Sequence, residues 1–218
     1  MSAPVVQRLA VIGCGLIGSS VVRAARQSGA AGFVAVGDLN PTVVARVQEL
    51  GIADLATTDI AEAVRGADLV IFATPVLAIE KALQAARPAL AEGCIVSDVG
   101  SVKGSVSDAM AAQAPDGVFV IPGHPIAGTE QSGPDAGFAE LFKNRWTILT
   151  PLAEDAAYLA AVDKLKAFWS ALGAQVELMD PRHHDLVLAV TSHLPHLIAY
   201  NIVGTAADLE EVTQAEGM

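Results

Sequence analysis

Three glycines, Gly13, Gly15 and Gly18, stand between a short apolar run and a helical pattern, in the order G-x-G-x-x-G. In this context the first glycine allows a tight turn, the second lets the backbone approach a pyrophosphate, and the third lets the helix pack closely on the strand. Leu16 and Ile17 open the helix, whose free N–H groups suit phosphates. The spacing predicts dinucleotide binding; the alternative is a glycine turn that packs a helix on a strand without a ligand.

Asp38 follows the next apolar run, twenty residues after Gly18. A carboxylate at this position accepts hydrogen bonds from the adenosine ribose hydroxyls and repels a 2′-phosphate. No Lys or Arg lies beside it in residues 37–40. The sequence therefore favours NAD over NADP.

A segment rich in glycine, proline and polar residues, Ile121–Pro134, carries His124 directly after an apolar run. Pro125 biases His124 toward an extended conformation. The ordinary pKa of a histidine, about 6.5, makes it a natural general base beside a nicotinamide. Glu130 is suited to orient a group or to close the pocket. The alternative for His124 is an ordinary surface loop residue.

Ser101 and Lys103 lie in a second glycine-rich segment, again directly after an apolar run. The carboxyl end of such a strand faces the ligand crevice of an open α/β sheet. Ser101 is placed to donate to a substrate hydroxyl or to a catalytic base, and Lys103 to supply positive charge. The alternative is a strand-to-helix turn in which Ser101 caps the helix.

His193 and His196 are three residues apart in the last helical pattern, so they share a face. Pro195 cannot donate a backbone hydrogen bond and should kink the helix. A kink beside two histidines predicts that this part of the helix forms the wall of a pocket. We expect no metal there, because two histidines without a clear third ligand do not make a zinc site. His183 and His184 come near the helix start, where we expect surface roles.

Short β-branched runs alternate with Ala-rich helical patterns over most of the chain, which indicates parallel strands joined by helices. Strands are expected at Leu9–Ile12, Phe33–Val36, Leu69–Ala73, Ile95–Ser97, Val118–Ile121, Trp146–Leu149 and Gln175–Met179, and helices at Leu16–Gln27, Thr42–Leu50, Ile60–Val64, Leu77–Ala89, Val102–Ala112 and Asp155–Leu172. The pattern predicts a Rossmann-type, doubly wound, mostly parallel sheet. Asp180 and Pro181 then open a new helix. We place a domain boundary there, with a nucleotide-binding domain over 1–180 and the start of an all-α domain over 181–218.

Composition excludes several classes of protein. With 218 residues, 52% of them hydrophobic and only 17% charged, the chain is too apolar to be disordered. Its 13 basic and 24 acidic residues give a net charge of −11, so the chain lacks the excess of basic residues that is typical of a nucleic-acid binder. Two cysteines and no evident leader favour a reducing, cytoplasmic setting. The apolar stretch over 69–79 is too short to span a membrane, so we expect no membrane segment.

Four ordered motifs make the chain resemble the prephenate dehydrogenase family, which includes arogenate and cyclohexadienyl dehydrogenases. They are Gly13–Gly18, Asp98–Lys103, His124–Gly133 and Ser192–His196, and they cover essentially the whole chain. The resemblance implies a 6-phosphogluconate-dehydrogenase-like, all-α dimerisation domain after the nucleotide-binding domain. It also implies a small-molecule substrate and a homodimer.

The resemblance further implies roles for individual residues. His124 would take the proton of the substrate's ring hydroxyl, and Ser101 would hydrogen-bond near it and the nicotinamide. His196 would line the substrate pocket and hold a carboxylate or side chain of the substrate. Thr129 and Glu130 would belong to the pocket and its gate.

The implied reaction is the NAD-dependent oxidative decarboxylation of prephenate or arogenate in tyrosine biosynthesis. Thr74 and Pro75 lie at the position where the chain of family members runs alongside the cofactor. Two alternatives are an NAD-binding sensor without chemistry and a β-hydroxyacid-type dehydrogenase. The polar loop around His124 argues against the sensor. The second alternative usually has a catalytic Lys on a helix of the second domain, and the last helix offers none.

In one respect the chain departs from the family pattern. Family members continue the helical domain and carry a substrate-binding Arg in a Gly-Phe-Arg-Asp type motif, which has no counterpart in residues 181–218. Either the helical domain is truncated here, or another segment substitutes for this Arg.

Overall fold

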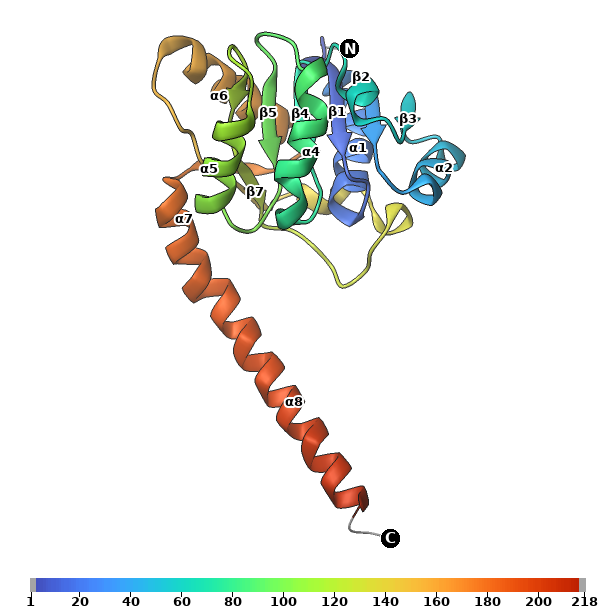
Figure 1. The fold of residues 1–218 in the computed structure, drawn as a ribbon, viewed down its shortest axis with the longest axis vertical. Coiled ribbons are helices and arrows are strands. Elements are labelled where there is room, and N and C mark those ends of the chain that lie inside the picture. Colours follow the sequence, from blue (N-terminus) through green and yellow to red (C-terminus); the bar gives the residue numbers. More distant parts are fainter. Residues whose placement is uncertain (1–2, 216–218) are drawn as a thin grey trace.

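The structure is a computed structural model that describes residues 3–215 as an α/β domain followed by a long helix (Figure 1). Six parallel strands pair in the order β3-β2-β1-β4-β5-β6. This order is that of the doubly wound dinucleotide-binding fold, and it confirms the predicted sheet. The strands are β1 (Val6–Ile12), β2 (Ala31–Gly37), β3 (Leu55–Thr57), β4 (Leu69–Phe72), β5 (Ile95–Asp98) and β6 (Phe119–Val120).

Helices cover both faces of this sheet because successive strand residues point to opposite sides. On β1, Leu9 and Val11 pack in the core under α1, α2 and α6, whereas Ala10 and Ile12 pack under α3, α4 and α5. The helices are α1 (Leu16–Ser28), α2 (Pro41–Leu50), α3 (Ile60–Val64), α4 (Ile79–Ala86), α5 (Gly104–Gln113) and α6 (Ala156–Ala171). The helix expected at 77–89 is shorter, with single 3₁₀ turns at both ends of α4. One of these turns contains Pro88, which cannot donate the hydrogen bond that would continue the helix.

A second, three-stranded sheet holds the segment around His124. Its strands are β7 (Gly123–Pro125), β8 (Trp146–Leu149) and β9 (Gln175–Leu178), with β7 antiparallel and β9 parallel to β8. The expected strands at 146–149 and 175–179 therefore form a sheet of their own rather than extending the large one. Sequence reasoning missed the short strands β3 and β7, which are stabilised by pairing with distant strands rather than by their own apolar pattern.

The chain ends in one long helical segment that leaves the domain (Figure 1). It comprises α7 (Pro181–Leu188), a π-helical turn (Ala189–His193) and α8 (Leu194–Ala215). Asp180 caps α7, as predicted, by accepting hydrogen bonds from the backbone N–H groups of residues 182 and 183. The irregularity expected from Pro195 takes the form of the π-helical turn just before it, a widened turn that is frequent at functional sites.

Much of the surface of α8 is apolar and exposed. Its exposed large side chains include Leu194, Leu197, Ile198, Tyr200, Ile202 and Val203. The helical stretch Pro181–Ala207 is long and apolar enough to cross a membrane by length and composition alone, with a mean hydropathy of 1.4 over its most apolar part. This stretch was not expected from the sequence as a candidate membrane segment, because polar residues such as Thr191, Ser192 and His193 interrupt it.

Candidate active site

The three fingerprint glycines play different parts in the loop between β1 and α1. Gly13 has a φ of +90°, and a Cβ on it would lie 2.7 Å from the Ala73 carbonyl oxygen. A Cβ on Gly18 would lie 2.0 Å from the Gly13 carbonyl oxygen. These two glycines are therefore required by the fold itself. Gly15 has no atom within 4 Å of where its Cβ would be, so its backbone faces open space.

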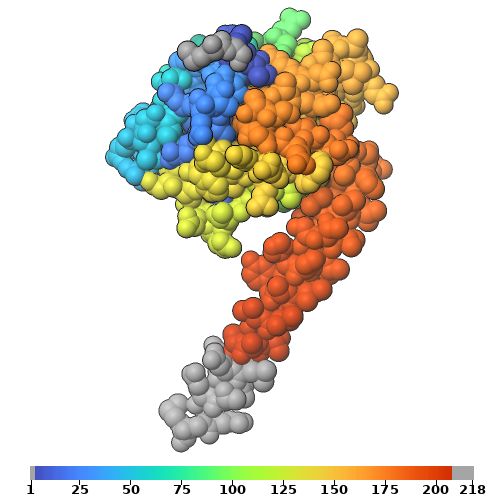
Figure 2. Space-filling model, turned by 180° about the vertical axis from the view of Figure 1, so that it is seen from behind, coloured from blue at the N-terminus to red at the C-terminus, as the bar shows by residue number. Residues whose placement is uncertain are grey.

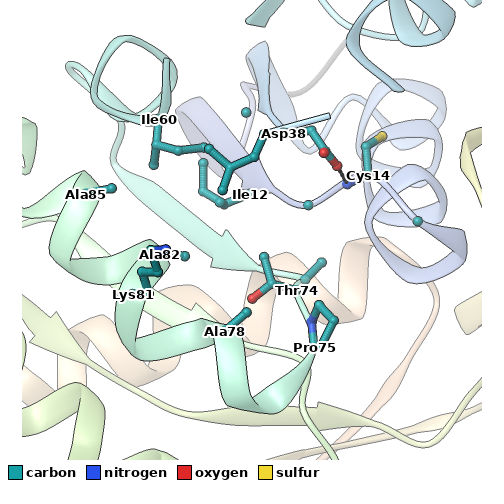
Figure 3. A pocket seen from close by; sticks show the side chains of 15 residues that line it. Ile12, Cys14, Asp38, Ile60, Thr74, Pro75, Ala78, Lys81, Ala82 and Ala85 are labelled. Carbon is teal, nitrogen blue, oxygen red and sulfur yellow. Dashed lines mark hydrogen bonds between the residues drawn. The ribbon is translucent and has the colours of Figure 1, made fainter. Parts of the chain in front are cut away.

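That open space belongs to a cavity of about 430 Å³ beside the carboxyl ends of β1, β2 and β4. Figure 3 shows Asp38 on one wall of the cavity and Thr74 and Pro75 on the opposite side. The Asp38 carboxylate accepts hydrogen bonds from the backbone N–H groups of Cys14 and Asn40, both at 2.9 Å. These bonds fix the orientation of the carboxylate at the wall of the cavity.

The cavity also carries unused hydrogen-bonding groups. The Thr74 hydroxyl oxygen is buried and has no hydrogen-bond partner within the described chain. The first turn of α1, which begins at Leu16 and continues through Ile17, has no side-chain cap. Buried polar groups are normally paired, so these groups point to a polar ligand in the cavity. An apolar wall, a fixed carboxylate and a free helix N-terminus together fit a dinucleotide.

One cationic residue of this cavity was not anticipated from the sequence. Lys81 on α4 lines the cavity across from Asp38 (Figure 3). It is 43 residues away from Asp38 along the chain, so no local pattern around Asp38 identifies it.

Lys103, expected to present positive charge to a ligand, is instead fully buried, and that expectation is wrong. Its ammonium group forms an ion pair with the fully buried Asp98 and donates to the Gly123 carbonyl oxygen at 2.8 Å. Asp98 in turn accepts from the backbone N–H groups of Gly100 at 2.8 Å and Gly123 at 3.1 Å. Burial raises the pKa of Asp98 and lowers that of Lys103, against the attraction between the two. The pair ties β5 to β7 directly beside His124.

Ser101 is exposed in the loop between β5 and α5. The alternative that it caps α5 is wrong, because the helix starts at Gly104 and Ser101 makes no cap hydrogen bond. The loop is close to the cofactor cavity, since a Cβ on Gly100 would lie 3.1 Å from the Val76 side chain, next to Pro75.

His124 sits on β7, and its Nδ1 lies 2.9 Å from Nε2 of His184. Burial lowers the pKa of His124 to about 3, because a charged imidazolium would be poorly solvated there, and the nearby Lys103 ammonium group acts in the same direction. The imidazole is therefore neutral at physiological pH. With Nδ1 occupied, Nε2 is the nitrogen left to accept a proton from a substrate.

The expectation that His184 is a surface residue is wrong. Its side chain is fully buried, and burial lowers its pKa. Its Nδ1 lies 2.9 Å from Oδ1 of Asp185, which accepts from the backbone N–H of Lys103 at 2.7 Å. The other carboxylate oxygen of Asp185 accepts from the Gly104 N–H at 2.8 Å. Asp185 was not expected from the sequence as a functional residue. The one signal that could have identified it is its position next to His184 near the start of a helix.

Three other sequence candidates lie apart from His124. Thr129 and Glu130 are exposed in the loop over 126–133, which projects on the side from which α8 leaves (Figure 2). His196 is exposed on α8, with Nδ1 2.7 Å from the Ser192 carbonyl oxygen. None of these three side chains is hydrogen-bonded to His124 in the described chain.

Two family models match the chain, one after the other. The prephenate dehydrogenase nucleotide-binding domain matches residues 21–178, and the prephenate dehydrogenase dimerization domain matches residues 180–216. Together they cover most of the α/β domain, from within α1 onward, and the long terminal helix.

Individual relatives agree with the family models. The cyclohexadienyl dehydrogenase of Zymomonas mobilis is 43% identical over 95% of this chain and 70% of its own length. The prephenate dehydrogenase of Bacillus subtilis is 32% identical over 88% of this chain. The chain spans only 51% of that relative, so about half of the Bacillus protein has no counterpart here.

Solved structures give the same result. The prephenate dehydrogenase of Aquifex aeolicus, in complex with hydroxyphenyl propionate and NAD⁺, superimposes with a TM-score of 0.82 at 34% identity, over 91% of this chain and 68% of that one. The arogenate dehydrogenase of Synechocystis has a TM-score of 0.80 at 28% identity, over 95% and 74% of the two chains. On the sequence motifs, the fold and these comparisons, the chain belongs to the prephenate dehydrogenase family.

Proposed function

We propose that this protein catalyses the NAD-dependent oxidative decarboxylation of prephenate, arogenate or both. The observation that carries the proposal is the half-buried, neutral His124, whose Nδ1 is taken by His184 and whose Nε2 is left for a substrate, together with a cavity suited to a dinucleotide. A sensor without chemistry has no need of a base at this point. The reaction gives tyrosine or its keto precursor, which places the enzyme in aromatic amino acid biosynthesis.

The cofactor would be held by the residues of the β1–α1 loop and the cavity. Gly13 and Gly18 shape the turn, and Gly15 lets the pyrophosphate approach the N–H groups of Leu16 and Ile17. Asp38 accepts from the ribose hydroxyls and disfavours NADP. Thr74 and Pro75 would lie alongside the bound cofactor, where the chain runs past it. NAD, when bound, would supply the acceptor for a hydride from the ring carbon that bears the hydroxyl.

His124 supplies the acid–base chemistry. Its Nε2 takes the proton of the ring hydroxyl as the hydride leaves the same carbon, so that a carbonyl forms. The ring carboxylate then leaves as CO₂, and the electrons of the broken bond complete the aromatic ring. His124 returns its proton to the phenolate oxygen of the product. A well-placed base contributes about 10²–10⁴-fold to the rate.

The remaining candidates would bind and orient the substrate. Ser101 would donate a hydrogen bond near His124 and the nicotinamide. Thr129, Glu130 and His196 would close around the substrate from the 126–133 loop and from α8. The apolar faces of α8 would pack against a second copy of the chain in a homodimer, which would bring these elements closer to His124.

We further propose a boundary near residue 180 between the two domains, and a cytoplasmic location, as for a biosynthetic enzyme of this class. The family match of the terminal helix to a dimerization domain supports a partner subunit rather than a membrane as the cover for α8.

A direct assay tests the reaction. Protein and NAD are mixed with prephenate or with arogenate, and NADH formation is followed by absorbance. We expect NADH with at least one substrate, and loss of turnover with retained NAD binding in His124→Asn. NADH formation from neither compound refutes the reaction, and turnover like that of the wild type in His124→Asn removes His124 from its role.

A further inference from the structure

We infer that Asp185 and His184 act together as positioning residues that fix the proton of His124 on Nδ1 and so leave Nε2 as the catalytic base. This deepens the proposed function and rests on it for the role of His124. The geometry of the three side chains carries it: an unbroken line of contacts runs from the carboxylate through one imidazole to the other.

The line of contacts has two short links. Oδ1 of Asp185 lies 2.9 Å from Nδ1 of His184, and Nε2 of His184 lies 2.9 Å from Nδ1 of His124. The two rings meet edge to face, with centroids 5.2 Å apart and planes at 65°. Three of the four imidazole nitrogens thus have one partner each, and Nε2 of His124 has none in the described chain.

Proton counting gives the line a direction. Asp185 is an acceptor at both oxygens, because it takes backbone N–H groups from Lys103 and Gly104. Burial works against its ionisation, but these hydrogen bonds and the one from His184 outweigh it and lower its pKa. An ionised carboxylate requires the proton of His184 to be on Nδ1. A neutral His184 then has only a lone pair at Nε2.

The same counting applies to His124. The lone pair of His184 can only accept, so Nδ1 of His124 must carry the proton, and Nε2 of a neutral His124 is left with a lone pair. The reverse tautomers would set a lone pair of His184 against the Asp185 carboxylate, which is repulsive. In catalytic triads a carboxylate fixes the tautomer of a base in the same way, and losing that control costs about 10⁴-fold in kcat.

The surroundings hold the line in place from several elements. On the α5 side, the N–H groups of Lys103 and Gly104 bind Asp185. The Lys103 ammonium group, paired with Asp98 of β5, and His193 of the π-helical turn are the other charged or titratable groups near His124. The line also joins the two domains, since His124 lies on β7 and both of its supports lie on α7.

The experiment reads the tautomer directly, in the intact protein and without turnover. Side-chain ¹⁵N chemical shifts of the histidines are measured at neutral pH, with His124→Asn used to assign the signals of His124. We expect a protonated Nδ1 and an unprotonated Nε2. A proton on Nε2, or a mixture of both forms in fast exchange, overturns the inference. This result does not depend on which substrate the enzyme takes, so it is separable from failure of the proposed reaction.

Variants test whether positioning matters for the rate. In His184→Phe the line is broken, and we expect kcat to fall by about 10²–10³-fold with KM values for NAD and substrate within about threefold. His184→Gln keeps the direction of the line, because its carbonyl accepts from His124 and its amide donates to Asp185, so part of the lost rate returns. The matched control His183→Phe, at the exposed neighbouring histidine, leaves kcat unchanged.

The outcomes are distinct. Equal kcat values in His184→Phe and the wild type, or His184→Gln no better than His184→Phe when both are folded by circular dichroism, overturn the positioning role. If His184→Phe does not fold, the wild-type tautomer and the His184→Gln rate still decide the question.

Discussion

The buried pair of Lys103 and Asp98 allows a quantitative prediction of stability. Both side chains have no exposed surface. In Lys103→Met the hydrocarbon stem is retained but the ammonium group is lost, so Asp98 is left as a buried carboxylate without its ion partner. Breaking a buried pair in this way costs about 3–5 kcal/mol of unfolding free energy. For a chain of this size each kcal/mol shifts Tm by about 2–4 °C, so Tm should fall by about 6–20 °C.

The penalty should depend on pH with a definite sign. Burial already raises the pKa of Asp98 above its ordinary value of 3.8, and removing Lys103 takes away the main opposing charge. Unfolded Asp98 ionises as the pH rises past this value, whereas the buried carboxyl resists ionisation. The stability of Lys103→Met relative to the wild type is therefore highest in acid and falls as the pH rises toward 8.

Thermal melts followed by circular dichroism at pH 5 and pH 8 measure both effects. The matched control is Lys166→Met, because Lys166 lies 3.9 Å from Asp163 in an exposed pair and should contribute no more than about 0.5 kcal/mol. Asp98→Asn combined with Lys103→Met should recover part of the loss, since the amide still accepts a backbone hydrogen bond. A Tm of Lys103→Met within about 2 °C of the wild type at pH 8 would refute the assignment of a tightly coupled buried pair.

Three further predictions concern the cofactor and the base. Gly15→Ala should fold normally, because its Cβ meets open space, yet bind NAD about 5–150-fold more weakly by calorimetry, since a methyl group that overpacks the pyrophosphate site costs about 1–3 kcal/mol. Gly18→Ala should instead lower Tm, and equal Tm losses in both variants would contradict this division of roles. Asp38→Ala should raise the KM for NAD by about 10–100-fold, since hydrogen bonds to charged groups contribute about 1.5–3 kcal/mol, and should lower the KM for NADP. An unchanged ratio of the two KM values would show that Asp38 does not select the cofactor. The lowered pKa of His124 keeps its base form present below pH 6.5, so the acid limb of the pH profile of kcat/KM should have its midpoint below that value. A midpoint at or above pH 6.5 would show that the imidazole is more solvated than the structure indicates.

Local features of this protein are readable from the sequence because local sterics and hydrophobic periodicity produce them. The turn at Gly13, the start of α1 at Leu16 and the cap of α7 at Asp180 all depend on residues close together in the chain. The alternation of apolar runs with helical patterns likewise determines a parallel sheet with helices on both faces. His124 was identifiable as a candidate base because it stands in a polar loop directly after such a run.

Contacts between distant residues were decided by the tertiary structure alone. His184 meets His124 across 60 residues, and no periodicity distinguishes a histidine buried against a distant strand from one on the surface of a helix. Lys103 looks like a ligand-binding cation in its glycine-rich segment, yet the folded chain surrounds it and pairs it with Asp98. The short strand β7 forms only because β8 supplies its hydrogen-bonding partner. The sequence thus determined the cofactor fold and the candidate base. Only packing between β5, β7 and α7 decided which side chains support that base, because burial and pairing depend on what the rest of the chain brings alongside.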